Sequence, residues 1–559
     1  MKNSLYIILL LLPLGLWAQE ETGDEVNSVE IRVVEDYKAQ VRAAHKISEQ
    51  PSFTDTTSQK IPVVVRIQPK GMTIDFQPDP IPAIRLGRVK LPKLPTQRVS
   101  LGGGMYSSSY ADIVFSSPRS RKNVWGIKAH HEGARSGVVN TAYTLQPSYE
   151  NSILTDFQRA TKNWNLKTQL LLNANYASFY GIMDTVGGNA NSRTPNEWNL
   201  SAGLSQQWLR TTNPTSKVPA AYRSGGIAYQ FTNAGIGAHE HLAKTIHRIE
   251  VYADEAQINV DLGYQFGQYS LTEMVFETRT NQYHHFNLSP QMQGKNGMLN
   301  YQFGLTFAGT INNEDLDHQG TYYIFPNINL QAEVLKRTLA VYGGWDGRAQ
   351  QQTLGALLAN VPVISGNQAL ALTGENRGYV GMQGALAGKL QYRVEGSLAF
   401  VMNDVQFQRD SITSTTINDM AALEVGYANY TRSRFRAELN LPMNSFTASV
   451  YSELNAYAGA DDFLGAEGRI LGALLRVDQG DLHLVSNLKY VGGRYSGSTE
   501  KGIYTLDDFM DLSLDLGYTI NENLSVSLRG YNLLNQRYQI WSGYEVRGTR
   551  GLFVLNYQF

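Results

Sequence analysis

The last nine residues, "GLFVLNYQF" at positions 551–559, alternate between two kinds of side chain up to the final residue. In an extended chain Phe553, Leu555, Tyr557 and Phe559 share one face, because successive side chains of a β-strand point to opposite sides. Chain ends are usually frayed and polar. An apolar face that continues to the last residue therefore predicts a strand held on both edges. The other face carries Leu552, Val554, Asn556 and Gln558.

The same period of two recurs along the chain from about Val99 onward. Apolar and aromatic side chains alternate with Asn, Gln, Lys, Arg, Asp and Glu in the stretches 163–181, 257–266, 389–400 and 510–520. Such alternation predicts strands with one apolar face and one wet face.

Turn signals separate these strands. Short turns are expected at Asn521–Asn523, Asp478–Asp481, Ala387–Gly388 and Gly294–Gly297. Longer polar loops are expected at Asp184–Thr194, Asn312–Gly320, Arg409–Asn418 and Ser496–Asp508. With about ten tight hairpins, the chain has room for roughly 20–22 strands, as in large outer-membrane barrels.

Two all-β architectures fit this pattern. A soluble sandwich or propeller would bury the apolar faces, whereas a membrane barrel turns them to lipid and the polar faces to a lumen. The predicted strands reach about 10–18 residues, against about 5–6 for typical strands, and Tyr and Trp cluster near their ends. We therefore expect an all-β fold: a transmembrane antiparallel β-barrel of about 22 strands with an extended N-terminal periplasmic leader.

Composition excludes several functions. The 559 residues contain no Cys and carry a formal net charge of -1, with 17% charged residues. Disulfides, thiolate metal sites, a thiol nucleophile and a lipid anchor on Cys are excluded, and the charge balance gives no argument for nucleic acid. His483 and Ser486 are close in sequence but on opposite faces of a strand, so no acyl-transfer pair is predicted and the chain is not expected to be an enzyme.

The N-terminus predicts export. Lys2 precedes an apolar run from Leu5 to Trp17, and a small residue, Ala18, follows. Residues 1–18 are therefore interpreted as a cleaved signal peptide, residues 19–98 as an extended, Pro-rich periplasmic leader without a plug, and residues 99–559 as the barrel. The leader's basic residues Lys90, Lys93 and Arg98 would thread the lumen, lie along a periplasmic partner, or belong to a flexible tether.

The C-terminal segment resembles the end of TonB-dependent receptor barrels. The resemblance rests on "NLLNQRY" at 532–538, "GYEVRGTRGL" at 543–552 and the terminal aromatic residue. It implies a 22-stranded barrel. It also implies that Phe553, Leu555, Tyr557 and Phe559 form the signal read by the barrel-assembly machinery.

The N-terminal part departs from that family. About 80 residues separate Gln19 from the first strand, whereas the family's plug is well over a hundred residues long and is preceded by a box that TonB grips. The stretch Val26–Tyr37 has only a faint likeness to such a box. The leader is more similar to that of plug-less, receptor-like barrels of Bacteroidota, in which it precedes a glycine-rich first strand.

Charged residues on the wet faces are the candidate site. Arg434, Arg436 and Glu438 share one face of their strand, as do Arg393 and Glu395 on another. On a lumen wall such charges would tune solute selectivity or grip a polypeptide. The equal alternative is that these charges have no role in transport and only stiffen and solvate the wall.

Other clusters carry weaker signals. His239, His241 and His247 would offer a metal site if two of them shared a face, or they are solvated side chains. The acidic loop at 312–320 has oxygen ligands for Ca²⁺ but lacks the spacing of an EF-hand loop. We therefore expect no catalytic residue, no bound cofactor and no metal site.

Three functions follow as hypotheses for a protein of the Gram-negative outer membrane. The first is outer-membrane transport, with the lumen blocked by the leader or by inward-folded loops. The second is a barrel subunit or accessory component of outer-membrane protein assembly or secretion machinery. The third is a TonB-gated importer with a reduced plug. The expected partners are outer-membrane lipid, the barrel-assembly machinery during insertion, and a periplasmic or outer-membrane protein, with no nucleic acid.

Overall fold

The chain divides into two units, Met1–Arg88 and Val89–Phe559. The computed structural model describes residues in the second unit. These are residues 96–118, 120, 122–138, 145–180, 196–211, 220–235, 237–253, 256–272, 278–312, 320–364, 370–409, 423–459, 467–499 and 502–559. The expected signal peptide, the stretch 26–37, Lys90, Lys93 and the acidic residues of the 312–320 loop lie outside the described residues.

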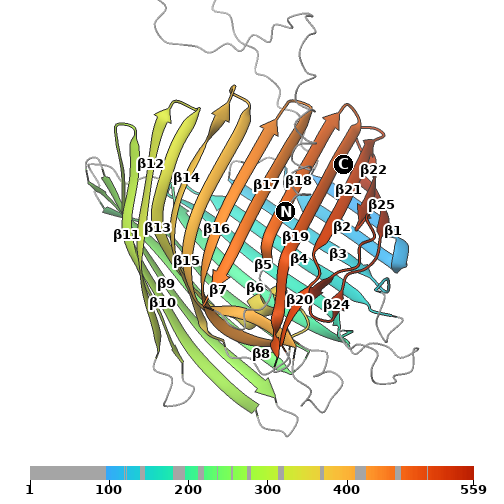
Figure 1. The fold of residues 1–559 in the computed structure, drawn as a ribbon, viewed down its shortest axis with the longest axis horizontal. Helices are drawn as coiled ribbons and strands as arrows, with labels where there is room; N and C mark the ends of the chain where they lie inside the picture. Colours follow the sequence, from blue (N-terminus) through green and yellow to red (C-terminus); the bar gives the residue numbers. More distant parts are fainter. Residues whose placement is uncertain are drawn as a thin grey trace, which may run out of the picture. The chain divides into compact units, whose positions relative to one another are not determined.

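One antiparallel sheet contains nearly every strand (Figure 1). Its strands are β1 (Gln97–Gly104), β2 (Ser108–Ser116), β3 (Asn123–Ala134), β4 (Ser148–Ala160), β5 (Trp164–Ser178), β6 (Asn196–Arg210), β7 (Ala220–Ala234), β8 (Ala238–Ala253), β9 (Ala256–Thr272), β10 (Thr278–Asn296), β11 (Leu299–Asn312), β12 (Thr321–Leu335), β13 (Leu339–Gln351), β14 (Leu372–Leu386), β15 (Leu390–Arg409), β16 (Leu423–Pro442), β17 (Phe446–Ala458), β18 (Glu467–Gln479), β19 (Leu482–Thr499), β20 (Gly502–Leu506), β21 (Phe509–Thr519), β22 (Leu524–Tyr531) and β25 (Arg550–Gln558).

The sheet closes on itself through its first and last strands. β1 pairs with β25 in antiparallel register from Arg98 opposite Gln558 to Gly104 opposite Leu552. The Phe559 N–H donates to Gln97 O at 3.1 Å, and the Thr96 N–H donates to Phe559 O at 3.1 Å. Among the described strands β20 pairs with β19 alone, so the ring itself has 22 strands. The predicted strand number is confirmed, and the last strand is held on both edges as expected, by β22 and by β1.

The two rims of the barrel differ. One rim, here called the turn end, carries the short connections 161–163, 297–298, 336–338, 387–389, 443–445, 480–481 and 520–523. The opposite rim, the loop end, carries the long segments 352–371 and 532–549, together with short links between β1 and β2 and between β7 and β8. Because the strand number is even, β1 begins and β25 finishes at the same rim, the turn end.

The short turns have the expected chemistry, with one shift. Ala387 and Gly388 both have positive φ, 48° and 71°, as does Gly480 at 59°. These left-handed conformations suit two-residue hairpins. The turn expected at Gly294–Gly297 lies later, at Gly297–Met298, because β10 continues to Asn296. The expected loop Ser496–Asp508 is wrong: β19 and β20 pair there as a β-hairpin above the rim.

The outward face of the barrel is apolar. Many large apolar side chains of this face are exposed, among them eight that are between 38% and 55% exposed: Leu170, Leu172, Leu262, Tyr264, Leu398, Phe400, Leu555 and Phe553. In a soluble protein such a belt would be unstable, whereas lipid covers it in a membrane barrel. None of the described helices is long and apolar enough to cross a bilayer.

The inward face of β25 explains an irregularity of the sequence. Leu552 and Val554, apolar where a wet face was expected, are 1% and 0% exposed and do not meet water. A Cβ at Gly102 on β1 would lie 2.8 Å from Cγ2 of Val554 and 2.7 Å from the Phe553 carbonyl oxygen. Glycine at 102 therefore lets the first strand lie close against the last one.

Candidate functional site in the barrel lumen

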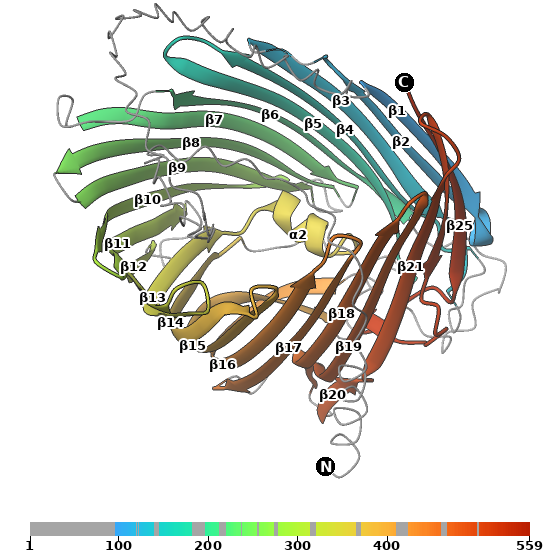
Figure 2. The same cartoon turned by 90° about the horizontal axis from the view of Figure 1, so that it is seen from above.

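A short helix lies inside the barrel at the loop end. α2 (Leu354–Asn360) belongs to the segment 352–371 between β13 and β14, and Figure 2 shows it within the ring of strands. Thr353 caps it: its Oγ1 accepts a hydrogen bond from the Ala356 N–H at 3.1 Å. Leu354, Leu357 and Leu358 follow at helical spacing and are all buried.

The helix is the centre of an apolar cluster, here called the closure. The wall strands β8, β9 and β10 supply Leu242, Tyr269, Leu271 and Tyr283, which are buried around it. Further members come from the helix, its flanking segment, the end of β5, the rim of β7 and β8, the start of β16 and the β23–β24 hairpin: Ala177, Phe179, Ala234, Ala238, Leu354, Leu357, Leu358, Val361, Val363, Ile364, Leu370, Leu423 and Tyr544. The closure thus joins distant parts of the barrel wall across the lumen.

Polar contacts fix the segment to the wall. Asn199 Nδ2 on β6 donates to Pro362 O at 3.0 Å. The Leu423 N–H donates to Val363 O at 2.8 Å, and Ile364 forms an isolated parallel bridge with Leu423. Such contacts satisfy backbone groups that would otherwise be buried and unpaired.

Glu240 on β8 lies under the start of the helix and is 1% exposed. Its Oε1 accepts a 2.8 Å hydrogen bond from Tyr283 Oη. The N–H groups of Leu354 and Gly355 lie near the same carboxylate, but neither makes a well-aligned hydrogen bond to Oε2. A carboxyl oxygen at the start of a helix is a favourable neighbour, because the unpaired N–H groups there carry partial positive charge.

Glycine at 355 sets how close the helix comes to the wall. A Cβ at this position would lie 2.5 Å from Gln230 Nε2 and 3.0 Å from Thr232 Oγ1, both on β7. A side chain at 355 would first have to displace the amide end of Gln230.

A second segment, 532–549, also contributes to the closure. It contains the paired strands β23 (Gln539–Trp541) and β24 (Tyr544–Glu545). Tyr544 is buried in the closure, and Tyr180 Oη donates to Glu545 O at 3.1 Å. Burial raises the pKa of the Tyr180 hydroxyl, so it remains a donor.

The "NLLNQRY" motif shapes this second segment. Asn532 has φ 46°, and its Nδ2 donates to Gln536 O and Arg547 O, both at 2.9 Å. Arg547 then donates from Nε to Ser136 O at 2.9 Å and from Nη2 to Gln146 O at 2.7 Å. The residues that carry the family resemblance thus tie the end of β22 to the β3–β4 connection.

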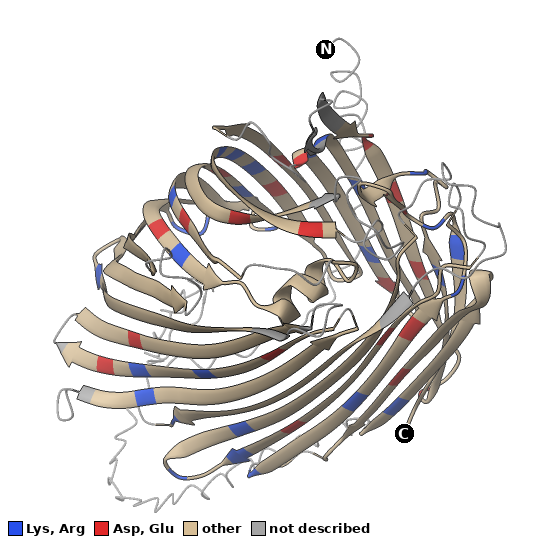
Figure 3. Ribbon diagram, turned by 90° about the horizontal axis from the view of Figure 1, so that it is seen from below, with Lys and Arg blue, Asp and Glu red and all other residues tan. Residues whose placement is uncertain are grey.

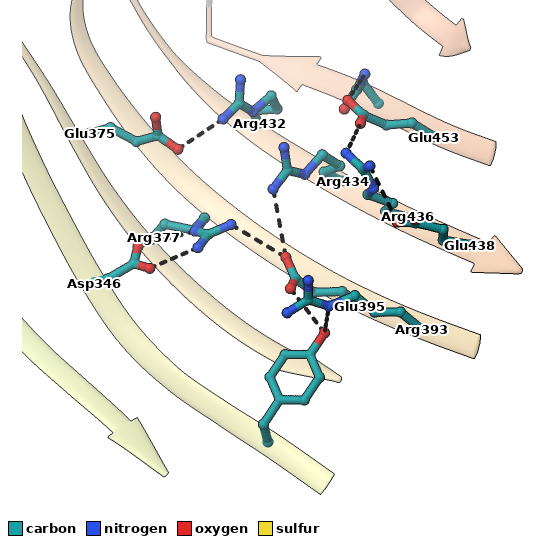
Figure 4. Close-up of polar contacts among 12 residues, drawn as sticks. Asp346, Glu375, Arg377, Arg393, Glu395, Arg432, Arg434, Arg436, Glu438 and Glu453 are labelled. Atoms are coloured by element: carbon teal, nitrogen blue, oxygen red, sulfur yellow. Dashed lines mark hydrogen bonds and ion pairs between the residues drawn. The ribbon is translucent and has the colours of Figure 1, made fainter. Parts of the chain in front are cut away.

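Ion pairs cover the inward face of β13 to β17 (Figure 4). Arg377 on β14 bonds Asp346 with Nε at 3.1 Å and Nη2 at 2.7 Å, and it lies 3.3 Å from Glu395 on β15. Arg434 on β16 lies 3.6 Å from the same Glu395 oxygen. The Glu395 side chain is 13% exposed, so this carboxylate is shielded enough for its partners to matter.

The other ion pairs continue the row. Arg432 and Arg348 each contact Glu375, at 2.8 Å and 2.7 Å. Arg436 contacts Glu438 at 3.4 Å and Glu453 at 3.6 Å. The ion pairs of Arg348, Arg377, Arg432, Arg434 and Arg436 are together called the arginine network.

Arg393 joins the network through a tyrosine. Its Nε donates to Tyr342 Oη at 3.0 Å, and Tyr342 Oη donates to Glu395 Oε2 at 3.1 Å. The five expected residues Arg393, Glu395, Arg434, Arg436 and Glu438 therefore lie together on the lumen wall.

Sequence reasoning missed other members: Asp346, Arg348, Glu375, Arg377, Arg432 and Glu453. Their alternation was available, but the pairing register of five strands was not.

A cavity of about 1020 Å³ lies in the lumen between the walls. Inward residues of β5, β8, β9, β10 and β13 line it, including Lys167, Lys244, Asp261, Asn287 and Arg348. Concave spaces of about this size with a few converging polar groups are the usual setting for solute binding.

The three histidines that were weighed against a metal site lie on the opposite side of the wall. His239, His241 and His247 alternate with the inward Glu240 and Leu242 and so face outward. Nδ1 of His241 is 2.7 Å from Tyr229 Oη, and Nδ1 of His247 is 2.8 Å from Tyr222 Oη. In the part of the chain that the structure describes, no three His, Cys, Asp or Glu residues form a metal-ligating group.

The other expected residues lie at the barrel seam. β1 begins at Gln97, so Arg98 is a residue of the barrel wall, where it bonds Asp112 at 3.1 Å. Phe553, Leu555, Tyr557 and Phe559 lie exposed on the outward face at the seam. Their role in barrel assembly stays a prediction.

Comparison with known proteins gives the fold a context. No protein-family model and no curated protein sequence matches the chain. The FrpB iron transporter from Neisseria meningitidis (F5-1 variant) superimposes with a TM-score of 0.63 and 9% identity, covering 84% of this chain and 83% of that one. The copper transporter OprC gives 0.60 and 10%, covering 84% and 81%. A mutant of the ferric enterobactin receptor PfeA from Pseudomonas aeruginosa, in complex with enterobactin, gives 0.60 and 12%, covering 83% and 81%.

At these identities the comparison concerns the fold alone. The chain has the 22-strand β-barrel fold of TonB-dependent outer-membrane receptors.

Proposed function

We propose that the protein is an outer-membrane transport barrel, not an enzyme, whose lumen is closed at the loop end by its own chain. The observation that carries this proposal is the closure: α2 and the β23–β24 hairpin form one apolar cluster with the inward faces of β8, β9 and β10. A barrel of 22 strands is wide enough to need a block. In this barrel the inward segments 352–371 and 532–549 supply one.

The two faces of the wall support the location. The outward apolar belt suits lipid, and the inward arginine network and cavity suit water and solutes. Short turns face the periplasm and long loops face the outside in bacterial barrels. The closure would therefore lie at the external mouth, and the cavity would open toward the periplasm.

The N-terminal assignments belong to the same proposal. Residues 1–18 would be removed as a signal peptide, and the chain from residue 19 to the start of β1 at Gln97 would serve as a leader rather than as a plug. Phe559 and the alternating apolar residues before it would guide insertion by the barrel-assembly machinery.

A reversible cross-link tests the closure. The chain has no Cys, so the pair Thr232→Cys and Gly355→Cys places two unique thiols where α2 contacts β7. The distance of 3.0 Å between a Cβ at 355 and Thr232 Oγ1 suits a disulfide. The purified full chain would be inserted in planar bilayers and its conductance recorded before and after reduction.

We expect low conductance in the oxidised pair and a several-fold rise in open events after reduction, with each single-Cys variant insensitive to reductant. Equal conductance in both states would contradict a closing role for α2. A barrel that never conducts and co-purifies in fixed ratio with an envelope protein would favour the subunit function instead.

A further inference from the structure

The cavity lies directly beneath the closure. Along the inward face of β8, Leu242 belongs to the closure, and Lys244, Ile246 and Arg248 follow at every second position and line the cavity. Residues two apart on a strand are separated by about 6.6 Å. One face of one strand therefore runs from the closure into the cavity.

The cavity lining is basic. Its cationic residues are Lys122, Arg159, Lys167, Lys244, Arg248 and Arg348, and among the described residues that line it Asp261 is the single acid. Asp261 is occupied by Arg248, which donates from Nε at 2.6 Å and Nη2 at 2.8 Å. Arg348 is likewise occupied by Glu375 at 2.7 Å.

Two inward lysines of the lining form no ion pair. Among the described residues, Lys167 and Lys244 contact no carboxylate within 4.0 Å. Lys128, which lies 3.5 Å from Asp112, is the lysine that does form an ion pair there. Glu240 shares the inward face of β8 with Lys244 and attracts it electrostatically, but it forms no ion pair with the lysine, and its carboxylate accepts a hydrogen bond from Tyr283 under α2. Positive charge that the protein does not neutralise raises the local concentration of anions in a confined lumen.

The opposite wall shows the contrast. In the arginine network Arg377, Arg432, Arg434 and Arg436 each contact a carboxylate. Figure 3 shows the basic and acidic positions along the strands. The arginines of one wall are therefore paired with carboxylates, whereas Lys167 on β5 and Lys244 on β8 form no ion pair with a described residue, although the same wall also holds the pairs Arg223–Glu250 and Arg248–Asp261.

The strand register gives the spacing of the two lysines. Lys167 on β5 lies opposite Gln207 on β6, and Gln207 lies opposite Gly226 on β7. Gly226 in turn lies opposite Ile246 on β8, and Lys244 is the next residue along the same face of β8. Three strand spacings of about 4.8 Å separate β5 from β8. A single small anion cannot contact both lysines closely, whereas an extended solute with separated charges can.

Neutral donors complete the lining. Gln207, Gln265 and Asn287 place amide groups on the inward wall between and beyond the two lysines. Amide N–H groups can donate to phosphate or carboxylate oxygens without adding charge.

We propose that this cavity binds an extended solute carrying two or more anionic groups, phosphates or carboxylates, held between Lys167 and Lys244 beneath the closure. The proposal rests on the proposed transport function in that it names the class of solute. Its chemistry leaves open whether the anionic groups are phosphates or carboxylates, and the experiment below separates the two.

Isothermal titration calorimetry on the detergent-solubilised full chain provides the test. The probes are tripolyphosphate, the tricarboxylate tricarballylate, and maltotriose as a neutral solute. We expect heat of binding with one or both polyanions, weaker at high salt because exposed charges are screened, and none with maltotriose. Binding of tripolyphosphate alone would assign phosphate chemistry, and binding of tricarballylate alone would assign carboxylate chemistry.

Variants assign the binding to the lysines. Lys167→Gln with Lys244→Gln should weaken polyanion binding at least tenfold. Lys336→Gln with Lys389→Gln, which removes two exposed lysines of the turn end, should leave it unchanged. Heat-modifiable migration on a gel would verify that each barrel is folded. If the double variant does not fold, the single variants Lys167→Gln and Lys244→Gln are measured in its place.

No binding of either polyanion at millimolar concentration, or equal affinity in the folded lysine variants, would overturn the proposal. Conductance plays no part in this measurement. A barrel that binds polyanions but shows no closure-dependent conductance would refute only the transport function, and the reverse result would refute only the anion site.

Discussion

Tyr283 on β10 donates a 2.8 Å hydrogen bond across β9 to Glu240 on β8, at the point where α2 begins. Both residues are buried, at 3% and 1% exposure. The relationship links two barrel strands and the inward helix in one contact, so it couples the wall to the closure.

Tyr283→Phe should loosen the closure. The variant leaves Glu240 Oε1 buried without its donor, and an unsatisfied buried acceptor costs about 1–3 kcal/mol. We expect more frequent open events in bilayer recordings and a lower midpoint of urea unfolding. Tyr322→Phe removes a hydroxyl from an outward side chain that is 57% exposed, and it should change neither. A Tyr283→Phe barrel that gates like the wild type would refute the coupling.

Leu357→Ala should destabilise the inward segment more than the barrel. Leu357 is 0% exposed at the centre of the closure, and truncating a buried leucine typically costs about 2–5 kcal/mol. Hydrogen exchange should show faster exchange in residues 353–364 with unchanged protection of the wall strands. Leu204→Ala, at an outward position 53% exposed, is the matched control. Uniform loss of protection throughout the barrel would show that α2 is instead part of one cooperative unit with the wall.

Arg377→Ala should make the lumen more cation-selective. It leaves Asp346 without its guanidinium partner and Glu395 with Arg434 alone, so the wall loses one positive charge. Because the site is partly solvated, we expect a loss of about 2 kcal/mol in unfolding free energy, below the roughly 3–5 kcal/mol of a fully buried broken pair. The measurement is the reversal potential in a salt gradient, recorded during the open events of channels in the Tyr283→Phe background. The control Lys336→Ala, at the turn end, should leave the reversal potential unchanged. An unshifted reversal potential for Arg377→Ala would show that the arginine network does not line the conduction path.

Phe559→Ser should reduce insertion without preventing synthesis. Phe559 lies at the seam, paired through its backbone with Gln97 and Thr96, and its side chain is 51% exposed outward. If it is part of the assembly signal, the amount of heat-modifiable barrel in outer-membrane fractions should fall several-fold. Gln558→Ala, on the inward face, keeps the backbone pairing and should insert normally. Equal insertion of both variants would remove Phe559 from the signal.

Asp508 should make the corner between β20 and β21 sensitive to acid. Its Oδ2 accepts a 2.7 Å hydrogen bond from Tyr490 Oη, and its Oδ1 accepts one from the Gly493 N–H at 2.8 Å. These bonds, that of Tyr490 first, lower the pKa of the Asp508 carboxyl below its ordinary value of 3.8. The ionised form is therefore favoured in the folded state. Its stabilisation is present above the unfolded pKa and is lost as pH falls through the lower folded pKa.

Hydrogen exchange of the corner over a series from about pH 5 to about pH 2, corrected for intrinsic rates, would report this loss. Asp508→Asn should abolish the dependence. The same acid response in Asp508→Asn would assign the titration to another group.

Much of the wall could be predicted from the sequence. Alternation is local, so "KLQYRVEGSLAF" by itself assigned Arg393 and Glu395 to the wet face, and the structure confirms that placement. The turns at Ala387–Gly388 and Gly480 were recognisable because glycine and short polar runs favour left-handed backbone. The loop expected at Ser496–Asp508 failed because its polar composition hid a hairpin that depends on pairing between β19 and β20.

The inward helix was beyond prediction from the sequence for a different reason. The run "LGALLAN" at 354–360 is seven residues, too short to be stable alone, and its leucines are buried only because Tyr269, Tyr283 and Tyr544 come from distant strands. Likewise, nothing local to Lys244 states that no carboxylate pairs with it. That property depends on the residues opposite it in the ring.

The sequence by itself determined the class of fold, the two faces of each strand and the place where the ring closes, because all three follow from a period of two and from the ends of strands. Only the tertiary structure decided the strand register, the partners of each charge and the presence of a closure above a basic cavity. Those features depend on contacts between residues far apart in the chain, and local sequence carries no record of such contacts.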